Sequence, residues 1–414
     1  MQLPQMAKVK QHFPDEYLSD VSGSVKKSLI ESGITNIVKP GQRIAISSGS
    51  RGISNIQTIT RTVVDSVKEI GGKPFILPAM GSHGGATADG QKDVLASYGI
   101  DKNSMGCPIE ATMDVLEVGK LVDNTPVLLN RLAVEADGVI LVNRIKPHTS
   151  FRGQFESGLM KMMTIGLGSH QGATIAHSKG AEGLARLIPA WGKTILQKAP
   201  ILMGIAIVEN AYEQTLKIEA ISANKFISRE PQLLDIARSS MPQIPCEGID
   251  VLIVDQIGKN ISGTGMDTNI IGRMLLPGVK EPNVPGASRI VALDLTDESH
   301  GNANGVGLSD IITRRLFEKI DFDATYANVF THTFLNRAHI PIIMESDQKA
   351  IEAAINVQRL RDNKEARIVR INNTLDIGEI SVSKSVLTEV LSKPGVKLTQ
   401  ELTPIQFDDF GNIL

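Results

Sequence analysis

Cysteine is scarce in this sequence, as are aromatic residues and long apolar runs. Cys107 and Cys246 are its two cysteines, too few for a disulfide framework, a four-cysteine zinc site or an iron–sulfur cluster. The opening stretch MQLPQMAKVKQHF does not resemble a signal peptide, and no run of about 18 apolar residues occurs without a charge. We therefore expect a soluble, cytoplasmic protein with no membrane partner.

The chain also lacks an excess of charge of either sign. Its 43 lysines and arginines against 45 aspartates and glutamates leave a formal charge of -2, with no basic block that would neutralise phosphates. Nucleic acid is excluded as an expected partner. With 42% hydrophobic residues, the 414-residue chain has enough apolar side chains for two or three domain cores. Only 4% aromatic residues beside 37 glycines favours an α/β fold.

Short runs rich in valine, isoleucine and leucine recur along the chain, bounded by glycine, proline or aspartate. Near-continuous apolar runs of this length are typical of parallel strands that are covered on both faces. They lie at Arg43–Ser48, Pro74–Met80, Gly138–Ile145, Ile201–Glu209, Val251–Ile257, Ile290–Leu295, Ile340–Met344 and Arg367–Ile371. Between the first two runs, apolar residues at helical spacing predict a helix that ends at Gly71, and hence a βαβ unit.

The succession of predicted strands and helices is interrupted at Met241–Pro245, which predicts a domain boundary near residues 238–248. We predict an N-terminal cofactor-binding and catalytic domain over residues 1–240. Residues 246–414 would form a C-terminal α/β domain that closes over the substrate. The expected fold is thus two α/β domains with mainly parallel sheets and the active site in the cleft between them.

Three of the eight histidines follow predicted strands: His83, His148 and His300. The carboxyl ends of parallel strands carry the loops that build active sites, so these histidines are candidates for general acid and base. Each of them read singly also fits a solvent-exposed loop residue. The glycines around His83 fit either a close approach to a ligand or a simple turn before a helix.

The segment from Gln154 to Gly180 has five glycines around Lys161, His170 and His177, which suggests backbone pressed against a bound cofactor. Lys161 stands among methionines, where partial desolvation would lower its pKa and make it nucleophilic; the alternative is a structural lysine that extends out of an apolar patch. The Ser47–Gly52 loop after the first strand fits a phosphate cradle or a plain turn.

Taken in order, these motifs resemble the nickel-pincer-nucleotide-dependent lactate racemase family and its 2-hydroxyacid racemase and epimerase relatives. The loop Ser47–Arg51 resembles the family's Ser-Ser-Asp-His-Thr-Arg-Pro loop, and Gly81–His83 its Gly-x-His. Ser157–Lys161 resembles in part the family's Ser-Gly-Gly-Arg-Lys, and His177 stands sixteen residues after Lys161, as the family's nickel ligand does after its lysine.

The resemblance implies a role for each matched residue. The cofactor would be pyridinium-3,5-bisthiocarboxylic acid mononucleotide nickel, the nickel-pincer nucleotide, held covalently by Lys161 with His177 as the protein's nickel ligand. His83 and His148 would be acid and base in a reversible hydride transfer that inverts C2 of a 2-hydroxyacid. The further candidates are Arg51, Ser48, Ser50 and Gly158 for cofactor binding, and Lys146, Arg152, Asn269 and His300 for substrate.

The resemblance also implies partners: a small 2-hydroxyacid substrate and the cofactor-synthesis enzymes, while a homo-oligomer stays open. The polar and basic residues around His148, which include Arg144, Lys146 and Arg152, suggest a substrate more polar than lactate, such as a sugar acid or a dicarboxylate.

Two other classes stay open. One is a zinc-dependent hydrolase or lyase in which His83, His148 and His177 bind the metal and Glu156 or Asp89 acts as base. The other is a non-catalytic nucleotide-binding module, which would need neither Lys161 nor several convergent histidines.

Overall fold

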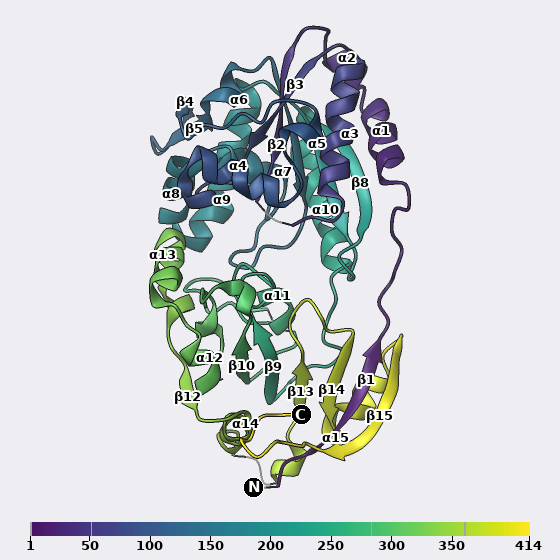
Figure 1. Cartoon of the computed structure of the whole chain (residues 1–414), viewed down its shortest axis with the longest axis vertical. Helices are drawn as coiled ribbons and strands as arrows, with labels where there is room; N and C mark the ends of the chain where they lie inside the picture. Colours follow the sequence, from purple (N-terminus) through teal and green to yellow (C-terminus); the bar gives the residue numbers. More distant parts are fainter. Residues whose placement is uncertain (1, 51, 283, 360–361) are drawn as a thin grey trace. The chain divides into compact units, whose positions relative to one another are not determined.

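The chain forms two compact units in the computed structural model, which describes residues 2–50, 52–282, 284–359 and 362–414. The N-terminal unit is Pro14–Met241, and the C-terminal unit combines Met1–Phe13 with Pro242–Leu414. Figure 1 shows the course of the chain through both units. We describe each unit separately.

The N-terminal unit is an α/β structure around a sheet whose described strands run in the order β3-β2-β6-β7-β8. Neighbours are parallel except β8, which is antiparallel to β7, and β4 and β5 form a separate hairpin. Its elements are α1 (Val21–Glu31), α2 (Ile34–Ile37), β2 (Arg43–Ser48), α3 (Ile56–Glu69), β3 (Lys73–Pro78), α4 (Ala88–Ser97), α5 (Lys102–Met105), β4 (Val115–Lys120), β5 (Pro126–Asn130), α6 (Arg131–Glu135), β6 (Gly138–Arg144), α7 (Leu159–Lys161), α8 (Ser169–Ser178), α9 (Gly180–Lys198), β7 (Ile201–Glu209), β8 (Thr215–Ser222) and α10 (Phe226–Ser239).

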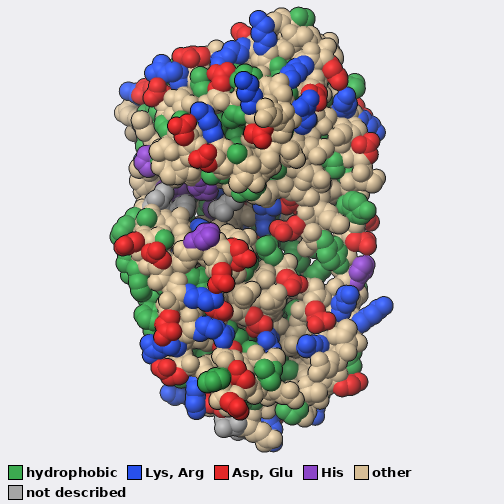
Figure 2. Space-filling view, viewed as in Figure 1, with side chains coloured by type: hydrophobic (Ala, Val, Ile, Leu, Met, Phe, Trp, Pro, Cys, Tyr) green, Lys and Arg blue, Asp and Glu red, His purple; other side chains and the backbone are tan. Residues whose placement is uncertain are grey.

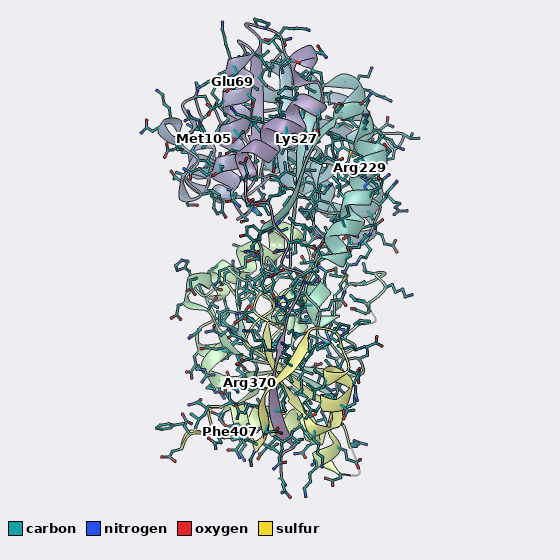
Figure 3. The ribbon with its side chains drawn as sticks, turned by 90° about the vertical axis from the view of Figure 1, so that its right-hand side faces the viewer. Lys27, Glu69, Met105, Arg229, Arg370 and Phe407 are labelled. Atoms are coloured by element: carbon teal, nitrogen blue, oxygen red, sulfur yellow. The ribbon has the colours of Figure 1, made fainter. Side chains whose placement is uncertain are left out.

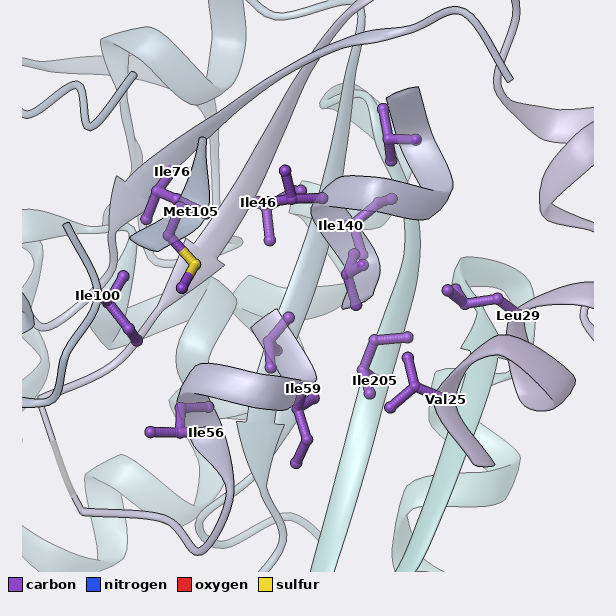
Figure 4. Close-up of a cluster of buried hydrophobic side chains, with 14 of the residues drawn as sticks. Val25, Leu29, Ile46, Ile56, Ile59, Ile76, Ile100, Met105, Ile140 and Ile205 are labelled. Carbon is purple, nitrogen blue, oxygen red and sulfur yellow. The ribbon is translucent and has the colours of Figure 1, made fainter. Parts of the chain in front are cut away.

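The core of the N-terminal unit lies between the sheet and helices α1 and α3 (Figure 4). The apolar residues of α3 recur every three or four positions, so one face of the helix is buried against the strands. On the opposite face of the sheet, Leu159 of α7 and Phe226 of α10 close on Gly204 of β7, where any side chain would collide with them. The labelled core residues are Val25, Leu29, Ile46, Ile56, Ile59, Ile76, Ile100, Met105, Ile140 and Ile205.

The C-terminal unit has a sheet whose described strands run in the order β12-β11-β10-β9-β13-β14-β1-β15. The block from β12 to β13 is parallel, and β14, β1 and β15 extend it as antiparallel neighbours. Its elements are β1 (Gln5–Gln11), β9 (Val251–Ile257), α11 (Thr268–Ile271), β10 (Arg289–Leu295), β11 (Ile311–Thr313), α12 (Arg314–Glu318), α13 (Phe322–His332), β12 (Ile342–Met344), α14 (Asp347–Asn356), β13 (Ile368–Ile371), β14 (Glu379–Ser383), α15 (Lys384–Leu391) and β15 (Val396–Pro404).

The predicted α/β fold with mainly parallel strands is confirmed, and each of the eight apolar runs holds a strand. The predicted first domain, residues 1–240, differs from the structure in its first thirteen residues. Strand β1 lies between β14 and β15 in the C-terminal sheet, where Met6 is opposite Ser383 and Thr403. Met6 and Ser383 are 377 residues apart in the sequence, and no local pattern reveals such a pairing.

Charged side chains of both signs are interspersed on the face of the molecule in Figure 2. A groove on the N-terminal unit, between α1, β8 and α10, is also lined by charged side chains of both signs. Lys27 lies 3.9 Å from Glu31, and Arg229 contacts Glu219 at 2.6 Å; Figure 3 marks Lys27 and Arg229. Within the described residues, no helix is long and apolar enough to cross a membrane.

Candidate active site

The candidate residues of the N-terminal unit follow three strands that are neighbours in its sheet. Ser48 ends β2 and Ser50 follows it, His83 follows β3, and His148 follows β6. Because β3, β2 and β6 are adjacent and parallel, their following loops leave the same edge of the sheet. The topology therefore supports the predicted gathering of these residues at one edge.

His83 lies in a glycine-rich turn that contacts the segment after Lys161. Gly81 has a φ of 61°, which a residue with a side chain rarely adopts, and its N–H donates to the carbonyl of Gly166 at 3.1 Å. The Nδ1 atom of His83 is hydrogen-bonded to the hydroxyl of Ser50, with 2.5 Å between the two atoms. The loops after β2 and β3 thus meet through these two side chains.

His148 is held by several contacts within its own loop. Its backbone N–H donates to Glu156 Oε2 at 2.7 Å, and its carbonyl accepts from Arg152 Nη1. Its Nδ1 atom accepts the N–H of Ser150 at 3.0 Å, and its ring packs on Phe151 with centroids 4.3 Å apart. These contacts fix the orientation of the His148 ring, because its Nδ1 atom, its ring face and the backbone of the residue are all held.

Glu156 organises this loop and is fully buried. Its Oε1 accepts from Arg238 of α10 at 2.7 Å and from the N–H of Gly153 at 3.2 Å, while Oε2 accepts from His148. Asp89, the other acid considered for a zinc mechanism, is exposed and lies 3.1 Å from Lys92. The structure thus gives Glu156 the role of holding the His148 loop together.

Lys161 and His177 are brought together by an irregular helical segment. Lys161 is the last residue of α7, and the five residues Met162–Gly166 continue as a π-helix, a form that is common at functional sites. His177 lies in α8 with its Nδ1 buried. Burial and the nearby Lys161 ammonium lower the pKa of His177 to about 4. Its imidazole is therefore neutral at pH 7, the form that binds metals.

The loop after β2 lies over the same segment. Ser47 Oγ donates to Met162 Sδ at 2.9 Å, and a side chain on Gly49 would meet the Met162 methyl group. Ser48 Oγ is buried and has no hydrogen-bond partner among the described residues. A buried hydroxyl in this state costs free energy unless a ligand satisfies it. Arg51, the predicted arginine of this loop, lies outside the described residues.

The sequence suggested that the basic residues near His148 contact the substrate. In the structure, two of them contact protein groups in and beside the His148 loop. Arg144 pairs with Glu209, whose other oxygen accepts the N–H of Ser54 at 2.7 Å. Arg152 donates to the His148 carbonyl and lies 3.6 Å from Glu156. Both guanidinium groups therefore stabilise local structure, whereas Lys146 pairs its backbone with that of Ser157 and leaves its side chain half-buried.

Asn269 and His300, predicted as substrate residues, belong to the C-terminal unit. Asn269 follows Asp267, the N-cap of α11, and donates to it from both its backbone and its side chain. His300 is exposed and has a φ of 47°. The N-terminal unit thus holds the other described candidates by itself, and these two stay predictions.

Glu230 was not identified from the sequence, although its carboxyl group contacts Met160, the residue before Lys161. It lies in α10 and is fully buried, and its Oε2 accepts the N–H of Met160 at 3.0 Å. A side chain on Gly158 would collide with its Oε1, which explains the glycine there. The sequence did contain a sign of its burial, because Glu230 lies at helical spacing from Phe226, Leu233 and Ala237, on the buried face of α10.

Burial raises the pKa of Glu230 to about 8, so the folded state binds a proton there that the unfolded chain releases near pH 4.5. The resulting stability is present at low pH and is lost as pH rises from 4.5 to 8. In Glu230→Gln, we expect the free energy of unfolding to fall less steeply with pH than in wild type, by about 1 kcal/mol per pH unit between pH 5 and 8. Denaturant unfolding at several pH values measures it, with exposed Glu182→Gln as control. Equal slopes in all three proteins would contradict the buried, protonated carboxyl.

Residues 5–183 match the family model described as the lactate racemase N-terminal domain. The match assigns residues 5–183 to this domain of the lactate racemase family. Its fold is similar to the solved lactate racemase apoprotein from Thermoanaerobacterium thermosaccharolyticum, with a TM-score of 0.54 and 15% identity over 89% of this chain and 99% of that chain. At that identity the likeness concerns the fold. No curated protein matches the chain.

The matched range includes most of the candidate residues. It contains His83, His148, Lys161 and His177, whereas Asn269 and His300 lie beyond it. This similarity supports an isomerase of the racemase or epimerase type.

The zinc reading finds no support in the structure or in the family. Among the described residues, no three histidines, cysteines, aspartates or glutamates are grouped closely enough to hold a metal ion. His83 and His148 each use Nδ1 in a local hydrogen bond, and the predicted acids Glu156 and Asp89 are engaged elsewhere. The alternative of a zinc hydrolase or lyase with three histidine ligands is therefore not supported.

Proposed function

We propose that the protein is a 2-hydroxyacid racemase or epimerase that uses the nickel-pincer nucleotide. The observation that carries this proposal is the proximity of Lys161 to His177, whose imidazole pKa is lowered by burial and, in second place, by the charge of Lys161. The family resemblance implied that both touch one cofactor. Two residues sixteen apart that come together at an irregular helix fit that role.

The residues present fit this cofactor. Lys161 would carry it covalently, and the neutral imidazole of His177 would serve as the protein's nickel ligand. The unsatisfied hydroxyl of Ser48 and the neighbouring loop would contact the nucleotide, with Ser50, Gly158 and Arg51 as further candidates. The chemistry that this group supplies when bound is reversible acceptance of the hydride from the substrate C2 carbon. Cofactor-synthesis enzymes would be the maturation partners.

His83 and His148 would handle the proton of the substrate hydroxyl. Both follow strands of the same sheet edge, and both present a ring whose Nδ1 is already hydrogen-bonded. Nε2 is therefore the atom that each ring would turn to a substrate. A general acid or base positioned in this way contributes about 10²–10⁴-fold to a rate.

We further propose a substrate more polar than lactate, such as a sugar acid or a dicarboxylate. The half-buried Lys146 and Thr149, which flank His148, support this proposal because they place a basic and a hydroxyl group beside the candidate acid and base. A site built to hydrogen-bond hydroxyl groups discriminates by up to about 10⁴-fold against a substrate that lacks them.

Exchange of deuterium into C2 tests the reaction class and the substrate together. Cofactor-loaded protein is incubated with lactate, malate, 2-hydroxyglutarate and gluconate, and chiral analysis follows both epimers. We expect inversion at C2 of a polar 2-hydroxyacid at a higher rate than with lactate. Faster turnover of lactate than of every polar candidate would contradict the polar substrate, and no inversion of any 2-hydroxyacid would contradict the function.

A further inference from the structure

We propose that Glu230 is a positioning residue for Lys161. Its carboxyl group, which contacts α7 from α10, would fix the start of that short helix and so orient the lysine amine toward the cofactor. This inference rests on the proposed function, because it concerns the residue that would carry the cofactor. It is drawn from a buried carboxyl group that bonds the backbone beside Lys161 and, among the described residues, forms no ion pair.

The start of α7 has no cap from its own sequence. Gly158 occupies the N-cap position and has no side chain that could accept a hydrogen bond. The first N–H groups of a helix have no partner within it, and buried ones need an acceptor from elsewhere. Glu230 supplies that acceptor: its Oε2 accepts the N–H of Met160 at 3.0 Å, and the N–H of Leu159 also favours its ionised form. A carboxyl group from another helix thus replaces the missing cap.

Gly158 leaves room for this carboxyl group. A Cβ atom there would lie 2.2 Å from Glu230 Oε1 and 2.8 Å from Ile145 Cδ1. The carbonyl of Gly158 accepts the side-chain N–H of Asn143 at 2.8 Å. The turn before α7 is therefore held from two sides, by β6 through this carbonyl and by α10 through the N–H of Met160.

The backbone on either side of Lys161 has little freedom. Met160 is fully buried and packs against Gly192 of α9, where a Cβ atom would lie 2.5 Å from the Met160 methyl group. On the other side, Thr164 Oγ1 donates to the carbonyl of Lys161 at 3.2 Å. Because the N–H of Met160 is bound to Glu230, the direction in which the Lys161 side chain leaves the helix is fixed as well.

The stability of the fold does not explain Glu230. It lies on the apolar, buried face of α10, where burial raises its pKa to about 8. Its Oε1 is buried and has no hydrogen-bond partner among the described residues, so the carboxyl group costs folding free energy at this position. The bond that an apolar residue could not make there is the bond to Met160. The backbone beside Lys161 is therefore what this carboxyl group stabilises.

Glu230 acts on the backbone by accepting a hydrogen bond rather than by its charge. Burial and the two N–H groups cause its pKa shift, and no charged side chain among the described residues contributes to it. A neutral amide of the same length could accept the same hydrogen bond. A carboxyl group on a shorter side chain would not reach Met160.

Two conservative substitutions separate reach from charge. Glu230→Gln keeps the length and an accepting oxygen, so we expect cofactor attachment and turnover within about threefold of wild type. Glu230→Asp keeps the carboxyl group but is one methylene shorter. Since a misplacement of about 1 Å can cost about 10²-fold, it should lower turnover by about 10–10²-fold. Glu182→Asp, the same change on the exposed surface of α9, should leave both quantities unchanged.

Amide hydrogen exchange gives a readout that needs neither cofactor nor activity. The protein is expressed without the cofactor-synthesis enzymes, and the exchange rate of the Met160 N–H is measured relative to that of Val63 in the core helix α3. This ratio should rise by about tenfold or more in Glu230→Asp and stay at the wild-type value in Glu230→Gln. An equal acceleration at both positions would show that the whole unit has loosened and would overturn the positioning role.

The possible results are distinguishable. If wild type gains the cofactor mass and Glu230→Asp equals it in turnover, or if Glu230→Gln is as impaired as Glu230→Asp, only the positioning role is overturned. An unchanged Met160 exchange rate in Glu230→Asp overturns it too. If wild type gains no mass although the free cofactor is produced, the proposed function falls, and the role of Glu230 toward the cofactor falls with it.

Discussion

Lys161→Ala is expected to abolish both the covalent attachment of the cofactor and the inversion of the substrate. Alanine has no amine to form the bond, and Lys161 is the lysine whose charge reaches His177. Intact mass spectrometry of protein co-expressed with the cofactor-synthesis enzymes measures the attachment, and chiral analysis measures the turnover. Peptide mapping of the wild type should find the added mass on Lys161.

Lys179→Ala is the matched control, because Lys179 directly precedes α9 near His177 and its side chain lies 3.6 Å from Asp123. This variant should keep the added mass and the turnover. Added mass and turnover that persist in Lys161→Ala would show that another residue carries the cofactor, and the proposed site would be wrong.

His83→Ala is expected to lower turnover by about 10²–10⁴-fold while nickel content stays near that of wild type. The reason is that His83 is bound to Ser50 at the end of β2, and its assigned work is proton transfer rather than metal binding. Steady-state kinetics in both directions and elemental analysis of the purified variant measure the two quantities.

His170→Ala provides the control for this variant, since His170 is an exposed histidine of α8. It should leave turnover and nickel content unchanged. A parallel loss of nickel and turnover in His83→Ala would place His83 among the metal ligands and overturn its role as acid and base.

The fold was largely predictable because its strands are buried on both faces. Runs such as Ile201–Glu209 and Val251–Ile257 are continuous in sequence and coincide with β7 and β9. Two of the strands that were not predicted, β15 and β1, have polar positions: β15 is mostly exposed, and β1 carries the exposed Lys8 and Lys10. Their place in the sheet depends on pairing between the two ends of the chain, which is a tertiary effect.

Candidate site residues could be predicted from the sequence where they directly follow a predicted strand or lie in a glycine-rich loop. His83, His148 and Ser50 follow strands, and parallel pairing brings the strands' ends to one edge. Contacts between distant side chains were not predictable: Arg144 is bound to Glu209, and Glu230 reaches Met160 from another helix. A basic residue near a histidine therefore suggested a substrate contact where the structure has an ion pair.

The most direct test of the account is the intact mass of the wild-type protein, expressed with and without the cofactor-synthesis enzymes. The account predicts that the mass rises by that of the attached nucleotide only when those enzymes are present, and that nickel accompanies the heavier species. Identical masses from both expressions, with confirmed production of the free cofactor, would contradict the central claim that Lys161 and His177 hold a nickel-pincer nucleotide.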